Sequence, residues 1–309
     1  MAIRIGGQAV MEGVMMKNED RYAVSVRKPD GEIETKVEDC VSFSKRHPAF
    51  ALPILRGMVS FIESMAIGMK TLNYSASFFE DEEEDTKASK VIENIWNGKG
   101  EKIMMTFIMI VSFAVSIGLF MILPYLASEL LHHWIRNEYI ILLLEGLIRI
   151  GIFLGYIVLI SRMEDIRRVF MYHGAEHKTI NCLEAGEDLT PKNVKKYSRL
   201  HKRCGTSFIF IVMIISMVFF FFIRVRTIWL RIVLRLLFLP LVAGVSYEFI
   251  RLAGKSDHPF VQLFSKPGLC LQKLTTQEPD ESMIEVAIAS VEGVFDWREY
   301  LKKERKKYE

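Results

Sequence analysis

Four long apolar runs dominate the pattern of hydrophobic and polar positions along this chain. They cover residues 103–126, 139–160, 207–223 and 228–250. About 20 consecutive apolar residues are enough for one helix to cross a bilayer. The pattern therefore predicts an α-helical polytopic membrane protein with about four transmembrane helices, in two pairs at 103–161 and 206–250.

The N-terminal segment, residues 1–50, has a period of two instead. Residues 23–27 and 33–37 alternate apolar and polar side chains on either side of the turn sequence Pro29-Asp30-Gly31. Alternation across such a turn predicts a β hairpin. This β-rich segment is expected to belong to an α+β cytosolic portion of the protein.

A glycine-rich stretch, residues 6–16, precedes the hairpin and holds two polar side chains among apolar ones, Gln8 and Glu12. Glycine lets a backbone turn or approach another group closely. Two interpretations stay open. Gln8 and Glu12 either point to water from a strand or belong to a site.

Residues 51–79 carry apolar side chains at three- and four-residue steps, which predicts an amphipathic helix. Arg56, Glu63 and Lys70 fall at seven-residue steps and share one face of this helix. The helix is too polar to cross a bilayer alone. It could lie on the membrane surface, but packing against the transmembrane bundle is the preferred interpretation. The acidic segment 80–102 that follows is expected to be a solvated linker.

Basic residues set the expected orientation. The loop 162–205 holds ten Lys and Arg, whereas the two other loops together hold Arg136, Arg224 and Arg226. Lys and Arg are enriched in cytoplasmic loops. With four spans, both termini and the C-terminal segment 251–309, with a helix at 280–295, then lie in the cytosol. A reducing cytosol keeps the four Cys free.

Composition agrees with a membrane protein and excludes one class. Half of the residues are hydrophobic, and the mean hydropathy is +0.21. The formal net charge is only +3, so nothing indicates nucleic acid as a partner. The expected environment is a lipid bilayer.

The clearest chemical motif is His-x-x-Glu-His within residues 172–178. On a helix, His173, Glu176 and His177 share one face. Two imidazoles can bind a divalent metal, and a carboxylate beside them can take a proton from water. The order matches the inverted zinc-hydrolase signature. The alternative is a surface helix that happens to carry two His.

A second arm of the loop carries further metal-ligand residue types. A helix is predicted over residues 165–184, and another from Thr190 and Pro191 to about Arg203. His201 and Cys204 fall on the inward face of that second helix. If the two helices pack as a hairpin, these side chains can reach the ion that the first arm binds.

The sequence leaves the type of metal site open. Four protein ligands would make a closed structural site, and three would leave a position for water at a catalytic site. Glu248 and Glu184 are candidates for a further carboxylate ligand. His together with Cys favours zinc, although other borderline ions accept the same ligands.

Four charged residues lie inside the apolar runs. Glu145 and Arg149 are four apart on the second run, and Arg231 and Arg235 are four apart on the fourth. Ionisable groups at membrane depth are candidates for function. Glu145 and Arg235 are expected at similar depth and can pair across the bundle. The alternatives are a structural ion pair that holds helix register or a path for an anion.

Five stretches carry a resemblance to a known family. They are residues 6–16, 172–178, 201–208, 267–269 and 274–279. With these motifs the chain resembles the YqhQ-like family of bacterial membrane proteins over nearly its whole length. The resemblance implies a metal-dependent enzyme. The usual family form has Pro where this chain has Lys202, a change that alters local stiffness and removes no ligand.

Two function classes follow. The first is a metal-dependent hydrolase at the cytosolic face, in which His173, His177 and His201 hold zinc with Cys204 or Glu248 as a further ligand. Glu176 is its general base, with Glu12 as a second catalytic candidate. Gln8, Arg56 and Glu63 are expected to orient substrate or support the site. The substrate is a peptide or a lipid head group.

The second class is a channel or transporter built as a homo-oligomer, because four spans are few for a monomeric pore. The intramembrane charges would line its path, and the metal would be structural or gating. A metal-stabilised assembly scaffold is a third possibility.

Overall fold

The structure is a computed structural model that describes residues 5–79, 100–222, 225, 227–253 and 258–305. The described chain is mostly helical, with one four-stranded sheet. All but the last three residues of the predicted acidic linker 80–102 lie outside the described residues, as does the end of the C-terminal tail.

Two compact units make up the chain. The sheet unit contains Met1–Phe79, Ile157–Ser216 and Arg235–Glu309. The helical unit contains Glu80–Tyr156 and Met217–Leu234. Both candidate metal-binding arms belong to the sheet unit.

The N-terminal residues form an antiparallel sheet larger than the predicted hairpin. Its strands are β1 (Ile5–Val10), β2 (Gly13–Asn18), β3 (Arg21–Arg27) and β4 (Ile33–Asp39). They pair in chain order, so β1 and β4 are the edges. The predicted hairpin is β3–β4. The glycine-rich stretch adds the hairpin β1–β2.

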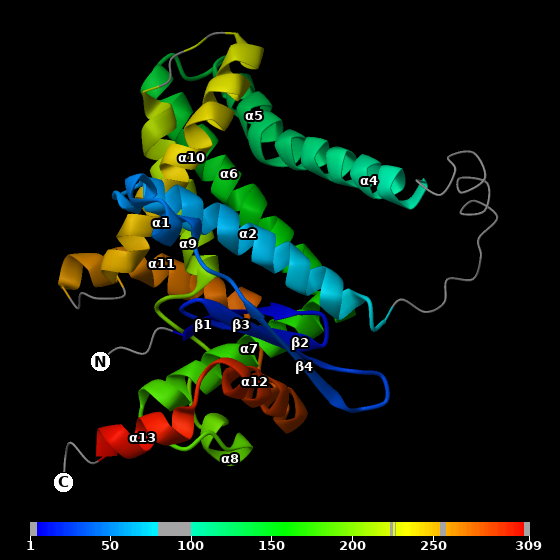
Figure 1. Ribbon diagram of the computed structural model, residues 1–309. Coiled ribbons are helices and arrows are strands. Elements are labelled where there is room, and N and C mark those ends of the chain that lie inside the picture. The colour runs from blue at the N-terminus through cyan, green and yellow to red at the C-terminus, as the bar shows by residue number, and fades with distance from the viewer. Residues whose placement is uncertain (1–4, 80–99, 223–224, 226, 254–257, 306–309) are drawn as a thin grey trace. The chain divides into compact units, whose positions relative to one another are not determined.

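Helices cover both faces of this sheet (Figure 1). On one face, Val10, Tyr22 and Val24 pack against α2 (Leu55–Ala76). On the other face, Val14 and Met16 pack against α7 (Glu164–Glu184) and α12 (Glu281–Val294). Alternate residues of a strand point to opposite faces, so the period-two pattern produces two separate apolar layers.

The helices predicted at 165–184 and 280–295 are confirmed as α7 and α12. Asp280 caps α12, because its side chain accepts a hydrogen bond of 2.9 Å from the Met283 N–H. The sequence pattern did not indicate α11 (Pro259–Thr275). Residues after α11 cross α7 at Gly174, where the Gln277 N–H donates to the Phe170 carbonyl at 2.8 Å.

The helix predicted from Thr190 to about Arg203 is much shorter. Thr190 does cap it, by accepting from the Asn193 N–H. The helix α8, however, covers only Pro191–Val194. The following residues are irregular because side chains of α7 bind their carbonyl groups, as described below. His201 and Cys204 therefore reach inward from a loop rather than from a helix.

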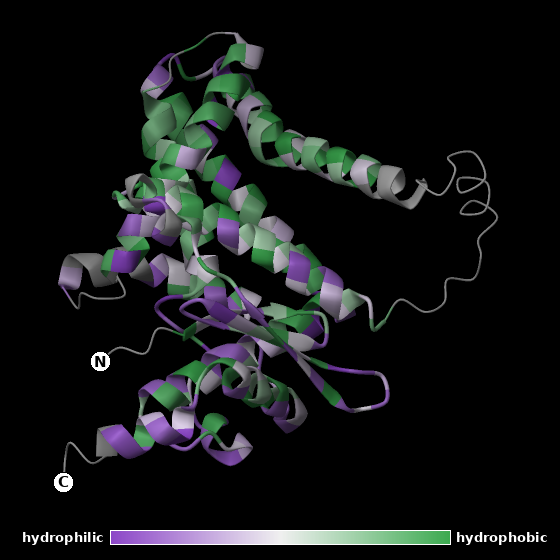
Figure 2. Cartoon of the chain, in the orientation of Figure 1, coloured by the Kyte–Doolittle hydropathy of each residue, from purple (hydrophilic) through white to green (hydrophobic). Residues whose placement is uncertain are grey.

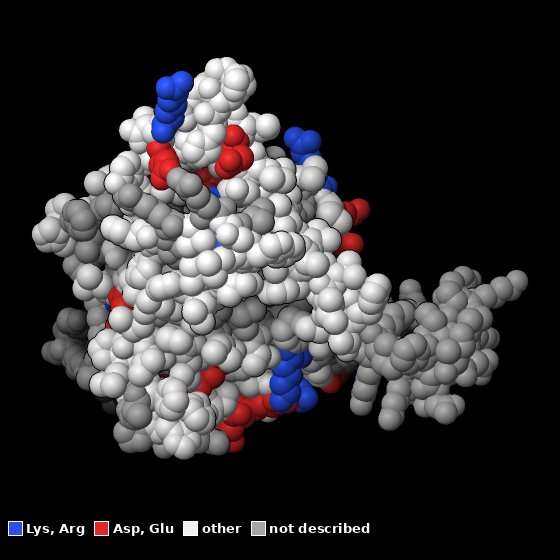
Figure 3. Space-filling model, turned by 90° about the horizontal axis from the view of Figure 1, so that it is seen from above, with Lys and Arg blue, Asp and Glu red and all other residues white. Residues whose placement is uncertain are grey.

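Apolar helices make up much of the remaining chain. They are α4 (Gly100–Ile117), the π-helical turn η2 (Gly118–Ile122), α5 (Leu123–Leu131), α6 (Glu138–Ile160), α9 (Gly205–Phe221) and α10 (Ile228–Ala253). Figure 2 shows apolar residues along their length. Charged side chains are sparse on the face shown in Figure 3.

Among the described residues, three helical stretches are long and apolar enough to cross a membrane. They are Thr106–Leu131, Glu138–Ile160 and Trp229–Leu252. The third predicted span corresponds to α9, which is apolar but shorter at 17 residues. The short elements of the chain are α1 (Phe43–Arg46), η1 (Pro48–Ala51) and α13 (Trp297–Arg305).

The first turns of α2 pack on apolar helices. Gly57 meets the backbone of Gly244 on α10, where a Cβ at Gly57 would lie 2.9 Å from the Gly244 carbonyl oxygen. The rings of Phe61 and Phe208, on α9, have centroids 5.6 Å apart. The glycines allow α2 and α10 to approach closely. The helix α2 thus connects the sheet to the end of α10 and the start of α9.

We predict that Gly174→Ala destabilises the sheet unit. Alanine favours a helix by about 1 kcal/mol over glycine, but its Cβ would collide with the Gln277 carbonyl oxygen, which is backbone. Overpacking of this kind costs about 1–3 kcal/mol. The midpoint of thermal unfolding in detergent should fall. Gly6→Ala is the control, since a Cβ there meets nothing within 4 Å. An unchanged or higher midpoint for Gly174→Ala would contradict this packing.

A second prediction concerns acid stability. The pKa of Glu38 is lowered to about 2, chiefly by hydrogen bonds from Lys70 and Tyr22. Its folded-state pKa is below the unfolded value of 4.5, so this contribution is present above pH 4.5 and is lost as the pH falls to about 2. Glu38→Gln should lower the unfolding midpoint at pH 6 and make little difference at pH 2. Glu32→Gln, on an exposed turn, is the control. Equal effects of Glu38→Gln at both pH values would refute the linkage.

Candidate metal centre

Three side chains converge in the sheet unit. Among the described residues, one ligand atom each from His173, His177 and Cys204 lie within 4.8 Å of one another. The two His are one turn apart on α7, and their ring centroids are 4.4 Å apart. Cys204 directly precedes α9 and approaches from the second arm of the loop, with Sγ 3.2 Å from His173 Nε2.

Backbone carbonyl groups orient both imidazoles. His173 Nδ1 lies 2.8 Å from the carbonyl oxygen of Thr275, and His177 Nδ1 lies 2.6 Å from that of Arg199. A carbonyl oxygen only accepts a hydrogen bond, so each Nδ1 carries the proton. Each Nε2 is then the ring nitrogen that is left to face a metal. Such contacts to the second nitrogen are typical of metal-binding His.

The surroundings of these three side chains suit a metal ion. His177 Nε2 is buried and has no hydrogen-bond partner among the described residues, and burial lowers the pKa of His177 while the nearby Cys204 opposes the shift. Thr206 Oγ1 lies 2.9 Å from Cys204 Sγ, and the Thr206 N–H donates to the same sulfur at 3.4 Å. Two imidazoles and a sulfur supported by donors fit a borderline divalent ion such as zinc.

Glu176 lies beside this cluster. Its side chain is almost fully buried, at 4% exposure, and burial raises its pKa while the nearby His173 and His201 oppose the shift. The backbone N–H of Gly7 hydrogen bonds to the carboxylate. Its other oxygen, Oε2, has no hydrogen-bond partner in the described part of the chain. A buried carboxyl with one free oxygen is positioned to accept a proton.

His201, which was also predicted as a ligand, contacts Glu184, and its role as a ligand stays a prediction. Its Nε2 lies 3.4 Å from Glu184 Oε2, and Glu184 also pairs with Arg203. Gln272 holds the backbone of His201, accepting from its N–H at 2.9 Å and donating to its carbonyl at 2.8 Å. The ring of His201 is 5.7 Å from that of His177, centroid to centroid. It is not one of the three converging residues.

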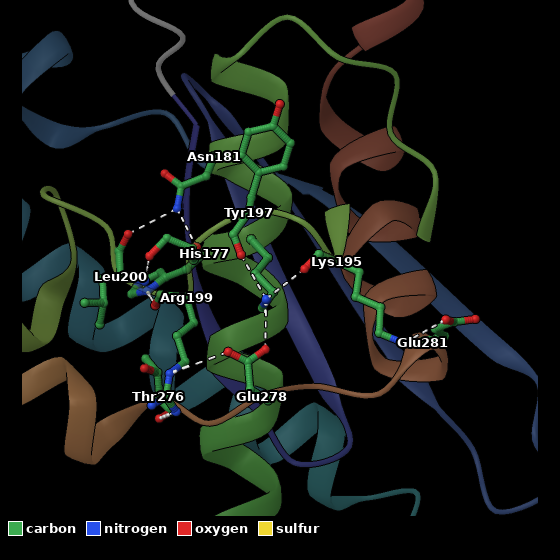
Figure 4. Close-up of polar contacts among 11 residues, drawn as sticks. His177, Asn181, Lys195, Tyr197, Arg199, Leu200, Thr276, Glu278 and Glu281 are labelled. Carbon is green, nitrogen blue, oxygen red and sulfur yellow. Dashed lines mark hydrogen bonds and ion pairs between the residues drawn. The ribbon is translucent and has the colours of Figure 1, made fainter. Parts of the chain in front are cut away.

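Polar side chains of α7 hold the loop that carries this region (Figure 4). Lys178 Nζ donates to the carbonyls of Lys195 at 3.1 Å and Tyr197 at 2.8 Å. Asn181 Nδ2 donates to those of Ser198 at 2.7 Å and Leu200 at 3.1 Å. These bonds, with that of His177, replace the backbone bonds of a helix. They explain why α8 ends at Val194 and leave the Arg199 carbonyl facing His177.

Gln8 and Glu12 lie outside the cluster. Gln8 Nε2 donates to Thr71 Oγ1 at 3.0 Å and therefore joins β1 to α2. Glu12, in the β1–β2 turn, pairs with Arg168 and accepts from the Tyr172 hydroxyl at 3.2 Å. Both side chains connect elements of the sheet unit, and the proposed catalytic role of Glu12 stays a prediction.

The other predicted support residues also join elements. Arg56 forms two hydrogen bonds to Glu248 on α10, at 2.6 and 2.5 Å, so Glu248 faces an arginine. Glu63 accepts from the Phe43 N–H at 2.6 Å and from Ser42 Oγ at 2.9 Å, at the start of α1. None of the three is in the converging group.

The intramembrane charges have internal partners. Arg149 donates to Glu145 at 2.8 Å and to the Phe120 carbonyl at 3.1 Å. Pro124, four residues after Phe120, has no N–H for that carbonyl, so Arg149 supplies the donor. Arg231 donates to the Val225 carbonyl and lies over the Tyr125 ring, while Arg235 is buried. The Glu145–Arg235 pair stays a prediction.

Comparison with known proteins places these residues in a family. The model of a protein family of unknown function, DUF1385, matches residues 52–297. The chain belongs to this family. It is 36% identical over 286 residues to the uncharacterized protein YqhQ of Bacillus subtilis (strain 168), covering 92% of this chain and 90% of that protein. The YqhQ-like resemblance of the sequence is therefore confirmed. No solved structure matches this chain.

Several residues of the centre carry no sequence signal. Thr275 and Arg199 act through backbone carbonyls, which every residue type has. Lys178 is one of ten basic residues in the loop 162–205, with nothing in the sequence to mark it as buried, and Gln272 lies in a helix that the pattern did not indicate. Only pairing with segments distant in sequence gives these residues their roles.

We predict that Lys178→Met loosens the loop over residues 195–200. The variant leaves two carbonyls without their donor and breaks the 2.8 Å ion pair with Glu278. Trypsin should cut after Lys195 or Arg199 about fivefold faster, because local opening exposes the chain. Lys192→Met is the matched control, since Lys192 is exposed on α8. Equal cleavage rates in the two variants would show that Lys178 does not hold the loop.

Proposed function

We propose that this protein is a metal-dependent hydrolase at the cytosolic face of a bacterial cytoplasmic membrane. The observation that carries the proposal is the convergence of His173, His177 and Cys204, with both imidazoles oriented so that Nε2 is left to face a metal. Zinc is the ion that these ligands favour.

The number of converging side chains supports a catalytic site rather than a closed structural one. Three protein ligands leave a position for water or substrate, whereas structural zinc has four. The side chain nearest to completing the set, His201, is turned toward Glu184. The carboxyl of Glu176 is buried, and one of its oxygens has no hydrogen-bond partner among the described residues.

These residues suit the hydrolysis of an acyl bond. A divalent ion, when bound, makes water more acidic and polarises a carbonyl group. Glu176 would accept the proton that water loses as its oxygen attacks, and would then pass it to the leaving group. The N–H of Gly7 hydrogen bonds to the Glu176 carboxylate and would help to keep it in position.

The proposed membrane arrangement has four spans: the three long apolar stretches and the shorter helix α9. The 17 residues of α9 extend about 26 Å, close to the thickness of a bilayer core. Cys204 comes directly before α9, so the metal centre would lie at the membrane surface. With the basic loop 162–205 in the cytosol, both termini are cytosolic.

Metal content of the purified protein in detergent tests the proposal. We expect about one zinc per chain, lost in His173→Ala, His177→Ala and Cys204→Ser and kept in His201→Ala. Glu176→Gln should keep its zinc and lose hydrolysis of p-nitrophenyl acetate, because it removes only the proton acceptor. Loss of zinc in His201→Ala as well would indicate a closed four-ligand site. A zinc-free unaltered protein, purified with zinc present, would rule the proposal out.

A further inference from the structure

Gly7 of the edge strand β1 lies beside Glu176, and the outward side of this strand carries backbone groups that do not bond to β2. The Arg27 N–H donates to the Glu12 carbonyl at 2.9 Å. Along a strand of an antiparallel sheet, the backbone N–H and C=O groups of one residue point to the strand on one side, and those of the next residue point to the opposite side. The even-numbered residues of β2 therefore bond to β3, and its odd-numbered residues bond to β1. Through the register of β1 and β2, this leaves Ile5, Gly7 and Ala9 with their N–H and C=O groups directed outward.

The contact with Glu176 agrees with this assignment. The Gly7 N–H reaches Glu176 instead of β2. A Cβ at Gly7 would lie 3.2 Å from Glu176 Cδ and would also crowd Met16, so glycine allows the carboxyl to approach the strand. The Gly7 carbonyl and both backbone groups of Ala9 have no partner among the described residues. A row of free backbone groups thus begins beside the proposed general base.

The two edges of the sheet differ in their protection. Natural proteins block exposed edges with charged side chains or proline. The edge strand β4 follows that rule, with Glu34, Lys36, Glu38 and Asp39. The edge strand β1 has no charged residue and no proline, and both Gly6 and Gly7 are exposed. An unprotected strand edge next to the proposed metal centre could bind a ligand with an extended backbone.

A cavity of about 440 Å³ adjoins the same strand. Gly6, Gly7 and Gln8 form one wall, and Ser64 and Ile67 of α2 form another. Its remaining lining carries both signs of charge, in Lys17, Glu19, Asp20 and Lys45. Because alternate side chains of a bound strand point to the same face, such a cavity can receive a side chain of a ligand paired with β1.

We propose that the substrate is an extended polypeptide segment that binds as an additional strand on β1. This proposal rests on the hydrolase function above and selects a peptide from the two substrate classes that the sequence leaves open. Backbone pairing supplies affinity in this mode of recognition, and pockets for alternate side chains supply specificity. The paired segment brings a peptide carbonyl next to Glu176 and the three metal-binding side chains.

The reaction is hydrolysis of that peptide bond. The water oxygen bonds to the carbonyl carbon, and Glu176 takes the proton. The C–N bond breaks, and the same proton goes to the departing nitrogen. The products are a carboxylic acid and an amine, so water is the only co-reactant.

Fluorescein-labelled casein, an unfolded protein, is the first probe, used with the full-length zinc-loaded protein in detergent. The structure predicts release of small fluorescent peptides, abolished in Glu176→Gln. Ala9→Pro should reduce this release about tenfold or more, because it removes one pairing donor and blocks close approach. Proline is tolerated on an edge strand where its nitrogen faces outward. Zinc content and the unfolding midpoint of Ala9→Pro verify that the variant folds.

The matched control is Asp39→Pro, which places the same substitution at the outward side of the other edge, β4. Cys40 donates its N–H to the Asp20 carbonyl. Because neighbouring residues of a strand bond to opposite sides, the backbone N–H of Asp39 points away from β3. Casein cleavage by Asp39→Pro should equal that of the unaltered protein. An equal loss in Ala9→Pro and Asp39→Pro would overturn the assignment to β1.

A second measurement does not depend on any variant. One peptide that the protein cleaves is resynthesised with a single N-methyl group at each position in turn. Pairing with β1 predicts that kcat/KM falls about tenfold at alternate positions. A loss at every position near the cleaved bond, without alternation, would contradict strand pairing.

The failure of this proposal is distinguishable from failure of the hydrolase function. If the unaltered protein hydrolyses p-nitrophenyl acetate or the phospholipids of phosphatidylglycerol vesicles in a Glu176-dependent way but never casein, the hydrolase stands and the peptide proposal is wrong. If the protein holds no zinc and hydrolyses none of these probes, both proposals fall.

Discussion

The candidate metal centre depends on two hydrogen bonds from imidazole rings to backbone carbonyls. His173 binds the carbonyl of Thr275, the last residue of α11, and a carbonyl in the last turn of a helix has no partner within that helix. His177 binds the carbonyl of Arg199 in an irregular loop. Each bond fixes one ring and its tautomer. The centre therefore exists only when α11 and the loop are both docked on α7.

The loop and the chain after α11 are held on α7 by residues outside the group of His173, His177 and Cys204. Lys178 and Asn181 bind the carbonyls of the loop, and Gly174 gives the chain after α11 room to cross α7. Buried donors and acceptors are costly when unpaired and stabilising when every one is satisfied. In contrast, Glu176 and His177 each keep one buried atom without a hydrogen-bond partner in the described part of the chain. Unsatisfied groups within a well-satisfied network are typical of functional sites.

Most charged residues discussed above have a partner of opposite charge. Arg56 with Glu248, Glu12 with Arg168, and Arg149 with Glu145 are each paired across elements or within one helix. These ion pairs hold the helices and strands of the protein together. Among the residues that the structure describes, one carboxyl, that of Glu176, combines burial with an oxygen that has no hydrogen-bond partner, and it lies next to the edge strand β1.

The sequence by itself determined the local structure and the chemical motif of this protein. Apolar runs predict the long helices, period-two alternation predicts β3 and β4, and the spacing of His173 and His177 places two imidazoles on one face of α7, because these patterns depend only on local geometry. The tertiary structure decided the rest. In the tertiary structure α8 is shorter than predicted, and β1 and β2 join the sheet. His201 contacts Glu184, and Cys204 is the third residue that converges with His173 and His177. The physical reason is that these outcomes depend on which distant donor reaches a given carbonyl, and a backbone carbonyl has no sequence signature.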